Sequence, residues 1–237
     1  MKGLVHKIIP FSAVDGPGNR TAVFLQGCNF NCKYCHNPET IPCKSEEEAK
    51  WMEAEEVVAE VMKNVPFIRG VTFSGGECTL QKEFLMEVIP MLRGKGLSVL
   101  LDSNGSLDFS KEEALVEMID GVMLDMKAFD KAEHKELTGR DNKLVLQNAV
   151  FLAERGLLTE VRTVIAPSLY SCNTAVEQIA RLLAPYNKEQ TMRYKLIQYR
   201  PHGVRKEYLN TKVPTKDYME QMKQIVESYG FTDIILT

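Results

Sequence analysis

"QGCNFNCKYCHNPET" (residues 26–40) places three cysteines within eight positions, at Cys28, Cys32 and Cys35. A structural zinc site needs four closed ligands, which usually come as two Cys-x2-Cys-type knuckles, so three thiols are one too few. His36 directly follows Cys35, and adjacent residues rarely reach one metal ion together. An odd number of thiols cannot be paired off completely as disulfides. The stretch therefore predicts an incomplete set of ligands.

Three thiolates suit a cubane iron–sulfur cluster in which one iron has no protein ligand, because thiolates are the usual ligands of such clusters. The open iron is then a coordination site for another molecule, as the open position is in catalytic zinc sites. The other cysteines, Cys43, Cys78 and Cys172, are scattered along the chain. The competing interpretation is a chance group of small buried hydrophobic residues.

The composition indicates one globular domain, residues 1–237, with a substantial core, since 44% of the residues are hydrophobic and 26% are charged. A net charge of −3 argues against nucleic acid as a partner. No apolar run approaches the ~20 residues that span a membrane, and the N-terminus lacks the features of a signal peptide. We expect a cytoplasmic protein, in which six cysteines indicate metal or redox chemistry before disulfides.

Short apolar runs alternate with amphipathic stretches along the whole chain, which predicts an α/β fold with a parallel sheet. Strands are predicted at 21–27, 70–75, 97–104, 121–127, 158–166, 192–199 and 231–236. Helices are predicted at 52–65, 81–96, 111–119, 142–155, 173–185 and 215–229, and Pro90 is expected to bend or interrupt the second. Residues 43–50 are expected to form a charged, solvated loop. Repeated βα units form an open doubly wound sheet or a full or partial barrel, with functional residues at the C-terminal ends of the strands.

Further motifs follow the predicted strands. "FSGGECT" (73–79) follows a predicted strand and carries a Gly-Gly-Glu sequence, which many turns contain. "LLDSNG" (100–105) and "MLDMK" (123–127) each put an aspartate after an apolar run, where a buried carboxylate needs a partner. Ordinary turn residues at strand ends are the simpler interpretation of these segments. "VDGPGNR" (14–20) is adequately explained as a tight turn.

Cys-x3-Cys-x2-Cys with an aromatic residue, Tyr34, before the last cysteine is the signature of the radical S-adenosylmethionine (radical SAM) enzymes, and the sequence resembles that superfamily. The DGPG-x-R, CHNP, Gly-Gly-Glu and Asp-Ser-Asn-Gly segments resemble glycyl radical enzyme activating enzymes, especially the pyruvate formate-lyase activating enzyme family, over almost the whole chain. The chain is similar to the YjjW-type branch but lacks the ferredoxin-like insert of that branch. The resemblance implies a partial (β/α)6 TIM barrel of the radical SAM type, with a single [4Fe-4S] cluster because three spare cysteines cannot hold two more cubanes.

The resemblance also assigns roles to residues. Cys28, Cys32 and Cys35 would hold the [4Fe-4S] cluster, and S-adenosyl-L-methionine would occupy its open iron. The implied contacts with this cofactor are Tyr34, Asn37, Gly75, Gly76, Glu77, Asp102, Ser103, Asp125, Lys127, Arg162 and His202. A monovalent cation, Na+ or K+, would be held by Asp102, Asp125, the Ser103 hydroxyl and the Met123 carbonyl. Asp15, Gly16, Pro17 and Gly18 would lie near the partner.

One family feature is altered here. The family has a tyrosine–histidine pair at the end of its sixth strand, whereas Tyr199 is followed by Arg200, with His202 two positions later. The contact with the cofactor therefore falls to either Arg200 or His202.

The implied activity is hydrogen-atom abstraction from a backbone glycine of a partner glycyl radical enzyme. The radical would come from reductive cleavage of S-adenosylmethionine, with reduced flavodoxin or ferredoxin as electron donor, and the chain is expected to be a monomer. Three alternatives stay open: a radical SAM enzyme acting on a small molecule or RNA, the activase of anaerobic ribonucleotide reductase, and a ferredoxin-like carrier or structural metal domain. The acidic composition argues against RNA.

Overall fold

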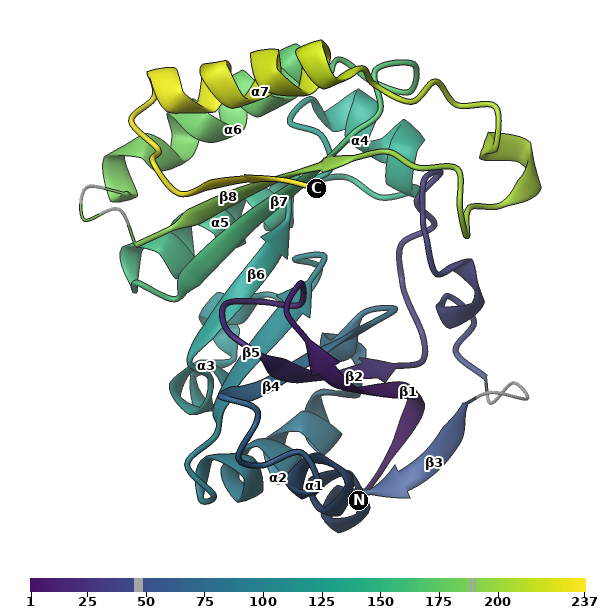
Figure 1. Cartoon of the computed structure of the whole chain (residues 1–237), viewed down its shortest axis with the longest axis vertical. Helices are drawn as coiled ribbons and strands as arrows, with labels where there is room; N and C mark the ends of the chain where they lie inside the picture. The colour runs from purple at the N-terminus through teal and green to yellow at the C-terminus, as the bar shows by residue number, and fades with distance from the viewer. Residues whose placement is uncertain (45–48, 188, 190) are drawn as a thin grey trace. The chain divides into compact units, whose positions relative to one another are not determined.

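The computed structural model describes residues 1–44, 49–187, 189 and 191–237, so residues 45–48 of the predicted loop at 43–50 lie outside the described part of the chain. These residues form two compact units (Figure 1). Unit 1 comprises Met1–Asn29, Glu39–Ser103 and Leu107–Met123, and unit 2 comprises Phe30–Pro38, Asn104–Ser106 and Leu124–Thr237. The division separates the cysteine motif, since Cys28 belongs to unit 1 while Cys32 and Cys35 belong to unit 2.

Unit 1 is built on a mixed sheet. Its strands are β1 (Lys2–Ser12), β2 (Arg20–Leu25), β3 (Lys50–Glu53), β4 (Gly70–Gly75) and β5 (Ser98–Ser103), and β6 (Gly121–Asp125) begins here and ends in unit 2. β1 pairs antiparallel with β2 and β3, whereas β2, β4 and β5 are parallel. The register pairs Leu25 with Gly75, so the C-terminal ends of β2 and β4 lie side by side.

In unit 1, one helix follows each of the strands β3, β4 and β5. These helices are α1 (Ala54–Met62), α2 (Lys82–Arg93) and α3 (Glu113–Met118), with 3-10 turns at Pro38–Thr40, Cys78–Gln81 and Phe109–Lys111. Each helix buries one face, and α2 does so through Phe84, Leu85, Val88, Ile89 and Leu92. The helix α2 continues through the exposed Pro90 to Arg93, so the expected interruption does not occur.

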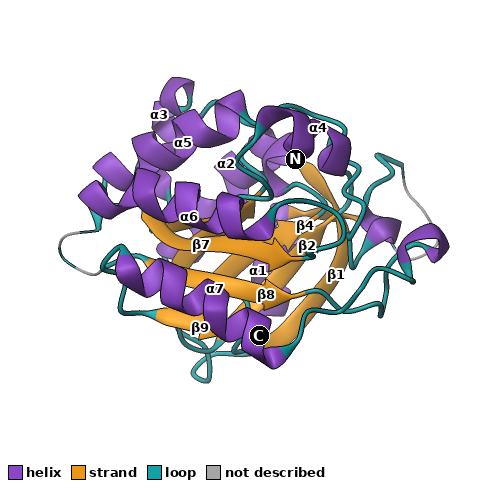
Figure 2. Ribbon diagram, turned by 90° about the horizontal axis from the view of Figure 1, so that it is seen from above, coloured by secondary structure: helices purple, strands orange, loops and turns teal. Residues whose placement is uncertain are grey.

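Unit 2 contains a parallel sheet covered by helices. The strands are β7 (Leu158–Ile165), β8 (Arg193–Gln198) and β9 (Ile234–Leu236), and the helices are α4 (Lys131–Thr138), α5 (Lys143–Glu154), α6 (Cys172–Leu183) and α7 (Lys216–Ser228). Short 3-10 turns lie at Ala184–Tyr186 and Lys206–Tyr208. Helices α6 and α7 lie side by side along the sheet (Figures 1 and 2).

The predicted alternation of strands and helices is confirmed, with boundaries that shift by a few residues. Three elements were not predicted: β1, β3 and α4. The predicted helix at 52–65 begins only at Ala54, because Lys50–Glu53 extends along β1 instead. The last strand is confined to Ile234–Leu236. No helix among the described residues is long and apolar enough to cross a membrane.

Candidate functional site

The cysteine loop, residues 30–36 of unit 2, is attached to the end of helix α4. The amide of Asn31 donates to the Thr138 carbonyl at 2.8 Å, and the amide of Lys33 donates to the Leu137 carbonyl at 2.9 Å. The last carbonyls of a helix lack hydrogen-bond partners within the helix. These two bonds therefore give partners both to the carbonyls at the end of α4 and to the amides of the loop. The Cys35 amide closes a turn onto the Cys32 carbonyl at 3.1 Å. The helix end thereby fixes the backbone that carries Cys32 and Cys35.

The segment after β8 also packs on this loop, at both of its ends. Arg205 donates to the side-chain oxygen of Asn31 at 2.6 Å, to the Asn31 carbonyl at 3.3 Å and to the Cys32 carbonyl at 3.1 Å. His36 lies 3.1 Å from the Arg200 carbonyl through Nε2 and stacks on the Tyr199 ring at 6.4 Å. Residues 199–205 therefore hold the cysteine loop in place.

Lys127 places a partly buried positive charge beside the cysteine loop. Its Nζ lies 2.7 Å from the Asp125 carboxylate and 5.9 Å from the centre of the Tyr34 ring. Burial acts to lower the pKa of Lys127, but Asp125, the Cys32 thiol and Tyr34 outweigh it and hold the pKa well above its ordinary value. The Tyr34 hydroxyl is buried without a hydrogen-bond partner among the described residues. The Lys127 ammonium, paired with Asp125, therefore lies within electrostatic reach of Cys32 and Tyr34.

In unit 1, the Gly-Gly-Glu turn packs against the segment that leads to Cys28. The amide of Gly76 donates to Leu25 at 2.9 Å, and the amide of Glu77 donates to Gly27 at 2.8 Å. A Cβ on Gly76 would lie 2.1 Å from the Gly27 carbonyl oxygen, so no other residue fits there. The Cys28 amide donates to Ile41 at 3.0 Å. The glycines thus position the backbone before Cys28.

Glu77 is fully buried and joins the ends of β4 and β5. Its carboxylate accepts bonds from the Thr79 hydroxyl at 2.6 Å, the Thr79 amide at 3.2 Å and the Ser103 hydroxyl at 2.9 Å. Asp102 accepts a bond from the Ser74 hydroxyl at 2.8 Å. Two carboxylates therefore lie at neighbouring strand ends, where the parallel sheet predicts functional groups.

The remaining predicted residues are placed as follows. Arg162, on β7, forms a buried ion pair with Glu160 at 2.5 Å. Asn37 and His202 are exposed. Of the four oxygen donors predicted for a cation, Asp102, Ser103 and Met123 belong to unit 1, while Asp125 belongs to unit 2 and pairs with Lys127. Within the described ranges, no three His, Cys, Asp or Glu side chains, the three motif cysteines included, form a group that could hold a single metal ion.

The predicted partner-binding turn, Asp15–Gly18, is packed against strands of unit 1. The Asp15 carboxylate accepts a bond from Ser12 at 2.6 Å, and its carbonyl accepts one from Thr72 at 2.5 Å. Gly16 has a φ of +117°, and a Cβ there would lie 3.0 Å from Leu100. The turn is therefore fixed by the sheet.

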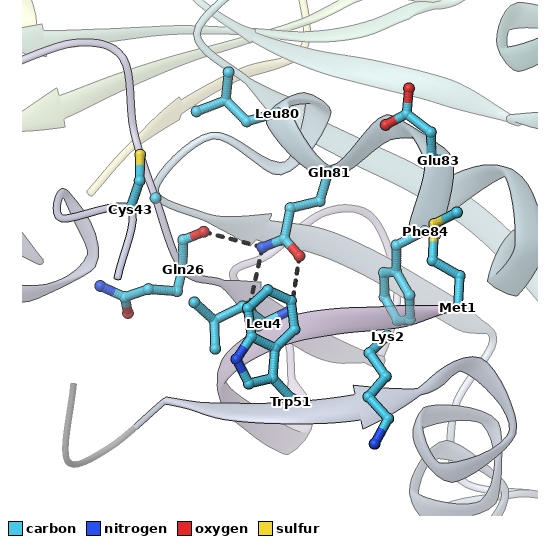
Figure 3. A pocket seen from close by; sticks show the side chains of 11 residues that line it. Met1, Lys2, Leu4, Gln26, Cys43, Trp51, Leu80, Gln81, Glu83 and Phe84 are labelled. Carbon is cyan, nitrogen blue, oxygen red and sulfur yellow. Dashed lines mark hydrogen bonds between the residues drawn. The ribbon is translucent and has the colours of Figure 1, made fainter. Parts of the chain in front are cut away.

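A pocket of about 280 Å³ lies on unit 1 between β1, β3 and the start of α2 (Figure 3). Gln81 crosses it, donating to the Leu4 carbonyl at 3.0 Å and the Gln26 carbonyl at 2.9 Å, and accepting from the Leu4 amide at 2.7 Å. Trp51 and Cys43 also line the pocket, but none of the predicted cofactor contacts does. The hydrogen bonds of Gln81 thereby join β1 to the segment that leads to Cys28.

Arg205 is the functional candidate that sequence reasoning missed. Its segment reads as a basic surface loop, and its partners Asn31 and Cys32 lie more than 170 positions away. No local pattern could have indicated this contact.

Solved structures share this fold. A radical SAM methyltransferase from Sphaerobacter thermophilus matches with a TM-score of 0.67 and 15% identity, over 92% of this chain and 66% of that chain. QueE from Escherichia coli matches with a TM-score of 0.60 and 12% identity, over 100% of this chain and 94% of that chain. The fold is the partial TIM barrel of radical SAM proteins, as predicted.

Sequence comparisons then identify the family. Residues 14–146 match the family described as a 4Fe-4S single cluster domain. A protein of Haemophilus influenzae named as a glycyl-radical enzyme activating enzyme is 34% identical, over 98% of this chain and 95% of that protein. The pyruvate formate-lyase-activating enzyme of Streptococcus mutans is 31% identical, over 98% of this chain and 93% of that protein. The chain belongs to the family of glycyl-radical enzyme activating enzymes, which confirms the predicted family and the prediction that the chain is an enzyme.

Proposed function

We propose that the chain activates a partner glycyl radical enzyme by removing a hydrogen atom from one of its backbone glycines. The observation that carries the proposal is the cysteine motif. Cys28, Cys32 and Cys35 are not joined in disulfides to other described residues, and the backbone of each is fixed by hydrogen bonds within its own unit. The family relationship supports the same activity.

The donor set fits an iron–sulfur cluster, because Cys28, Cys32 and Cys35 offer three sulfur ligands and Lys127 offers a partly buried positive charge beside Cys32. The chemistry that a [4Fe-4S] cluster and S-adenosylmethionine supply when bound is reductive cleavage to methionine and a 5′-deoxyadenosyl radical, which takes the hydrogen atom. Hydrogen-atom transfer moves no net charge, so this chain needs no general base.

The other side chains of the site position and orient the groups that react. Asp125 fixes the Lys127 ammonium at 2.7 Å. We assign contacts with S-adenosylmethionine to Tyr34, Lys127 and the ends of β4 and β5, with Asn37, Arg162 and either Arg200 or His202 as further contacts. A monovalent cation bound by Asp102, Ser103, Met123 and Asp125, and a partner loop against Asp15–Gly18, belong to the same proposal. The proposal also includes a cytoplasmic location, a monomeric state, and reduced flavodoxin or ferredoxin as the electron donor.

The experiment is anaerobic. The chain is reconstituted with iron and sulfide, reduced, and mixed with S-adenosylmethionine and a candidate glycyl radical enzyme, and the sample is examined by electron paramagnetic resonance. We expect a glycyl-type doublet on the partner. Cys35→Ala should abolish it, whereas Cys43→Ala, at an exposed cysteine outside the motif, should retain it. Deoxyadenosine release without any radical on candidate partners, together with turnover of a small molecule, would contradict the proposal.

A further inference from the structure

The segment after β8 combines positive charge with exposed apolar side chains. Residues 199–216 hold five lysine and arginine residues against one glutamate, in a chain whose net charge is −3. Arg200, Lys206, Lys212 and Lys216 are exposed, and none of them forms an ion pair with another described residue. Leu209 and Val213 are 43% and 41% exposed among them. We call these six residues the basic surface.

The basic surface is held in a fixed shape on unit 2. Tyr199 donates through its hydroxyl to the Tyr208 carbonyl at 2.7 Å, and Gln198 donates to the Pro214 carbonyl at 2.7 Å. The Lys212 amide donates to the Ser168 hydroxyl at 3.3 Å. A pre-formed surface loses less conformational entropy on binding than a mobile loop does.

The same segment is in direct contact with the cysteine loop. Arg205, next to Lys206, donates to the carbonyls of Asn31 and Cys32 at 3.3 and 3.1 Å. A Cβ on Gly203 would lie 2.5 Å from the His36 carbonyl oxygen, so the backbones of the two segments are in contact there. A protein seated on the basic surface would therefore lie against the loop that carries Cys32 and Cys35.

We propose that the basic surface docks an acidic, one-electron carrier protein that reduces the cluster. The inference rests on the proposed function and adds to it the docking surface of the electron donor. Opposite charge favours such a carrier, because it steers encounter and orientation, and weak redox complexes need only a small interface with an apolar centre. One electron leaves the reduced carrier and takes the cluster from the 2+ to the 1+ state, and no bond is formed or broken. Glu207 and Asp217 are the acidic groups beside the surface.

The test compares charge-reversal variants of the reconstituted chain. Lys206→Glu/Lys212→Glu/Lys216→Glu reverses the surface and leaves Arg205 unchanged. Lys63→Glu/Lys95→Glu/Lys143→Glu is the control, because these lysines are equally exposed and lie outside the surface. Formation of 5′-deoxyadenosine is followed with a reduced, strongly acidic flavodoxin as electron donor and, separately, with dithionite. Binding of the same flavodoxin and of a glycyl radical enzyme is measured by titration.

With flavodoxin at low salt, we expect the surface variant to be slower by about tenfold or more and to lose its salt dependence. The control variant should behave as the wild type, and all three proteins should match with dithionite. Equal rates of 5′-deoxyadenosine formation by the two variants with flavodoxin would overturn the proposal. So would a surface variant whose rate falls as much with dithionite as it does with flavodoxin. A surface variant that binds flavodoxin normally but has lost binding to the glycyl radical enzyme would also overturn it. A wild-type chain inactive even with dithionite would instead refute the proposed function.

Discussion

At the scale of single residues, Arg205 explains how the cysteine loop, residues 30–36, keeps a fixed shape. Its guanidinium donates to two carbonyls and one side-chain oxygen of the cysteine loop, and the guanidinium carbon lies 5.2 Å from the centre of the Tyr208 ring. Hydrogen bonds from a charged donor contribute about 1.5–3 kcal/mol when partly shielded from water. The residue therefore acts by positioning the two cysteines.

Replacing Arg205 by glutamine should loosen the cysteine loop without unfolding the chain. We expect amides of residues 30–36 to exchange with solvent roughly tenfold faster or more, because a loss of about 1–3 kcal/mol of local stability raises the open population. Hydrogen exchange of the cluster-free chain measures this directly. Lys206→Gln, at the exposed neighbour, is the control, and equal exchange in both variants would contradict the role given to Arg205.

Glu77 has a structural role in the cluster-free chain that the sequence did not indicate. Three hydrogen bonds end on its buried carboxylate. Glu77→Ala should lower the free energy of unfolding by about 2–3 kcal/mol, because it leaves buried donors without acceptors. Glu77→Gln keeps the Oε1 acceptor and should cost less. Urea denaturation of the two variants separates them, and a neutral Glu77→Ala would show that these bonds contribute nothing.

At the scale of elements, the turn after β4 depends on close contact between backbones. A Cβ on Gly76 would meet the Gly27 and Thr40 carbonyls at 2.1 and 2.7 Å. Gly76→Ala should therefore lower the free energy of unfolding by about 2 kcal/mol or more, since backbone cannot yield as a side chain can. Gly94→Ala should stay within about 1 kcal/mol, because Gly94 already has helical geometry at the end of α2. If Gly76→Ala and Gly94→Ala had similar thermal stability, the close backbone contact at Gly76 would not have the cost given to it here.

Helix α4 gives the chain a dependence on pH through His134. This imidazole is buried, lies 2.8 Å from the Arg140 carbonyl through Nδ1 and packs edge-on against Phe30. Burial lowers the pKa of His134 below its ordinary 6.5; Lys127 also lowers it, while the Arg140 bond and Asp141 raise it. The unfolded chain therefore binds this proton more readily than the folded chain does.

Stability from His134 should accordingly be complete above pH 6.5 and decrease as the pH falls below it. His134→Gln should flatten the fall in unfolding free energy between pH 7.5 and 5.5, as measured by urea denaturation of the cluster-free chain. His202→Gln, at an exposed histidine, should leave the pH profile as it is in the wild type. An unchanged slope in His134→Gln would contradict the burial argument.

The sequence predicted the buried parallel strands well, because an apolar run between turn residues has few other interpretations. It missed β1, in which Pro10 and charged residues interrupt the apolar pattern of a half-exposed antiparallel strand. It missed α4 because eight residues with little apolar content carry almost no periodicity. Two signals were available there: Asp130 caps the helix by accepting from the Ala132 and Glu133 amides, and Gly139 ends it with a φ of +81°.

At the scale of the whole molecule, the residues predicted for the site are divided between the two units. Unit 1 provides Cys28 and the strand ends with Glu77 and Asp102, while unit 2 provides Cys32, Cys35 and Lys127. The motif spacing predicted the three cysteines, and the resemblance supplied the remaining roles. Neither could indicate Arg205 or the bonds that end on Glu77, because these arise only when distant segments pack together.

The most direct test of the central claim is the metal content and spectrum of the anaerobically reconstituted chain. We predict about four iron and four sulfide ions per chain, and a reduced-cluster signal in electron paramagnetic resonance that changes when S-adenosylmethionine is added. Cys28→Ala, Cys32→Ala and Cys35→Ala should each lose the signal. Tightly bound zinc in place of iron, or a reduced cluster indifferent to S-adenosylmethionine, would contradict the account.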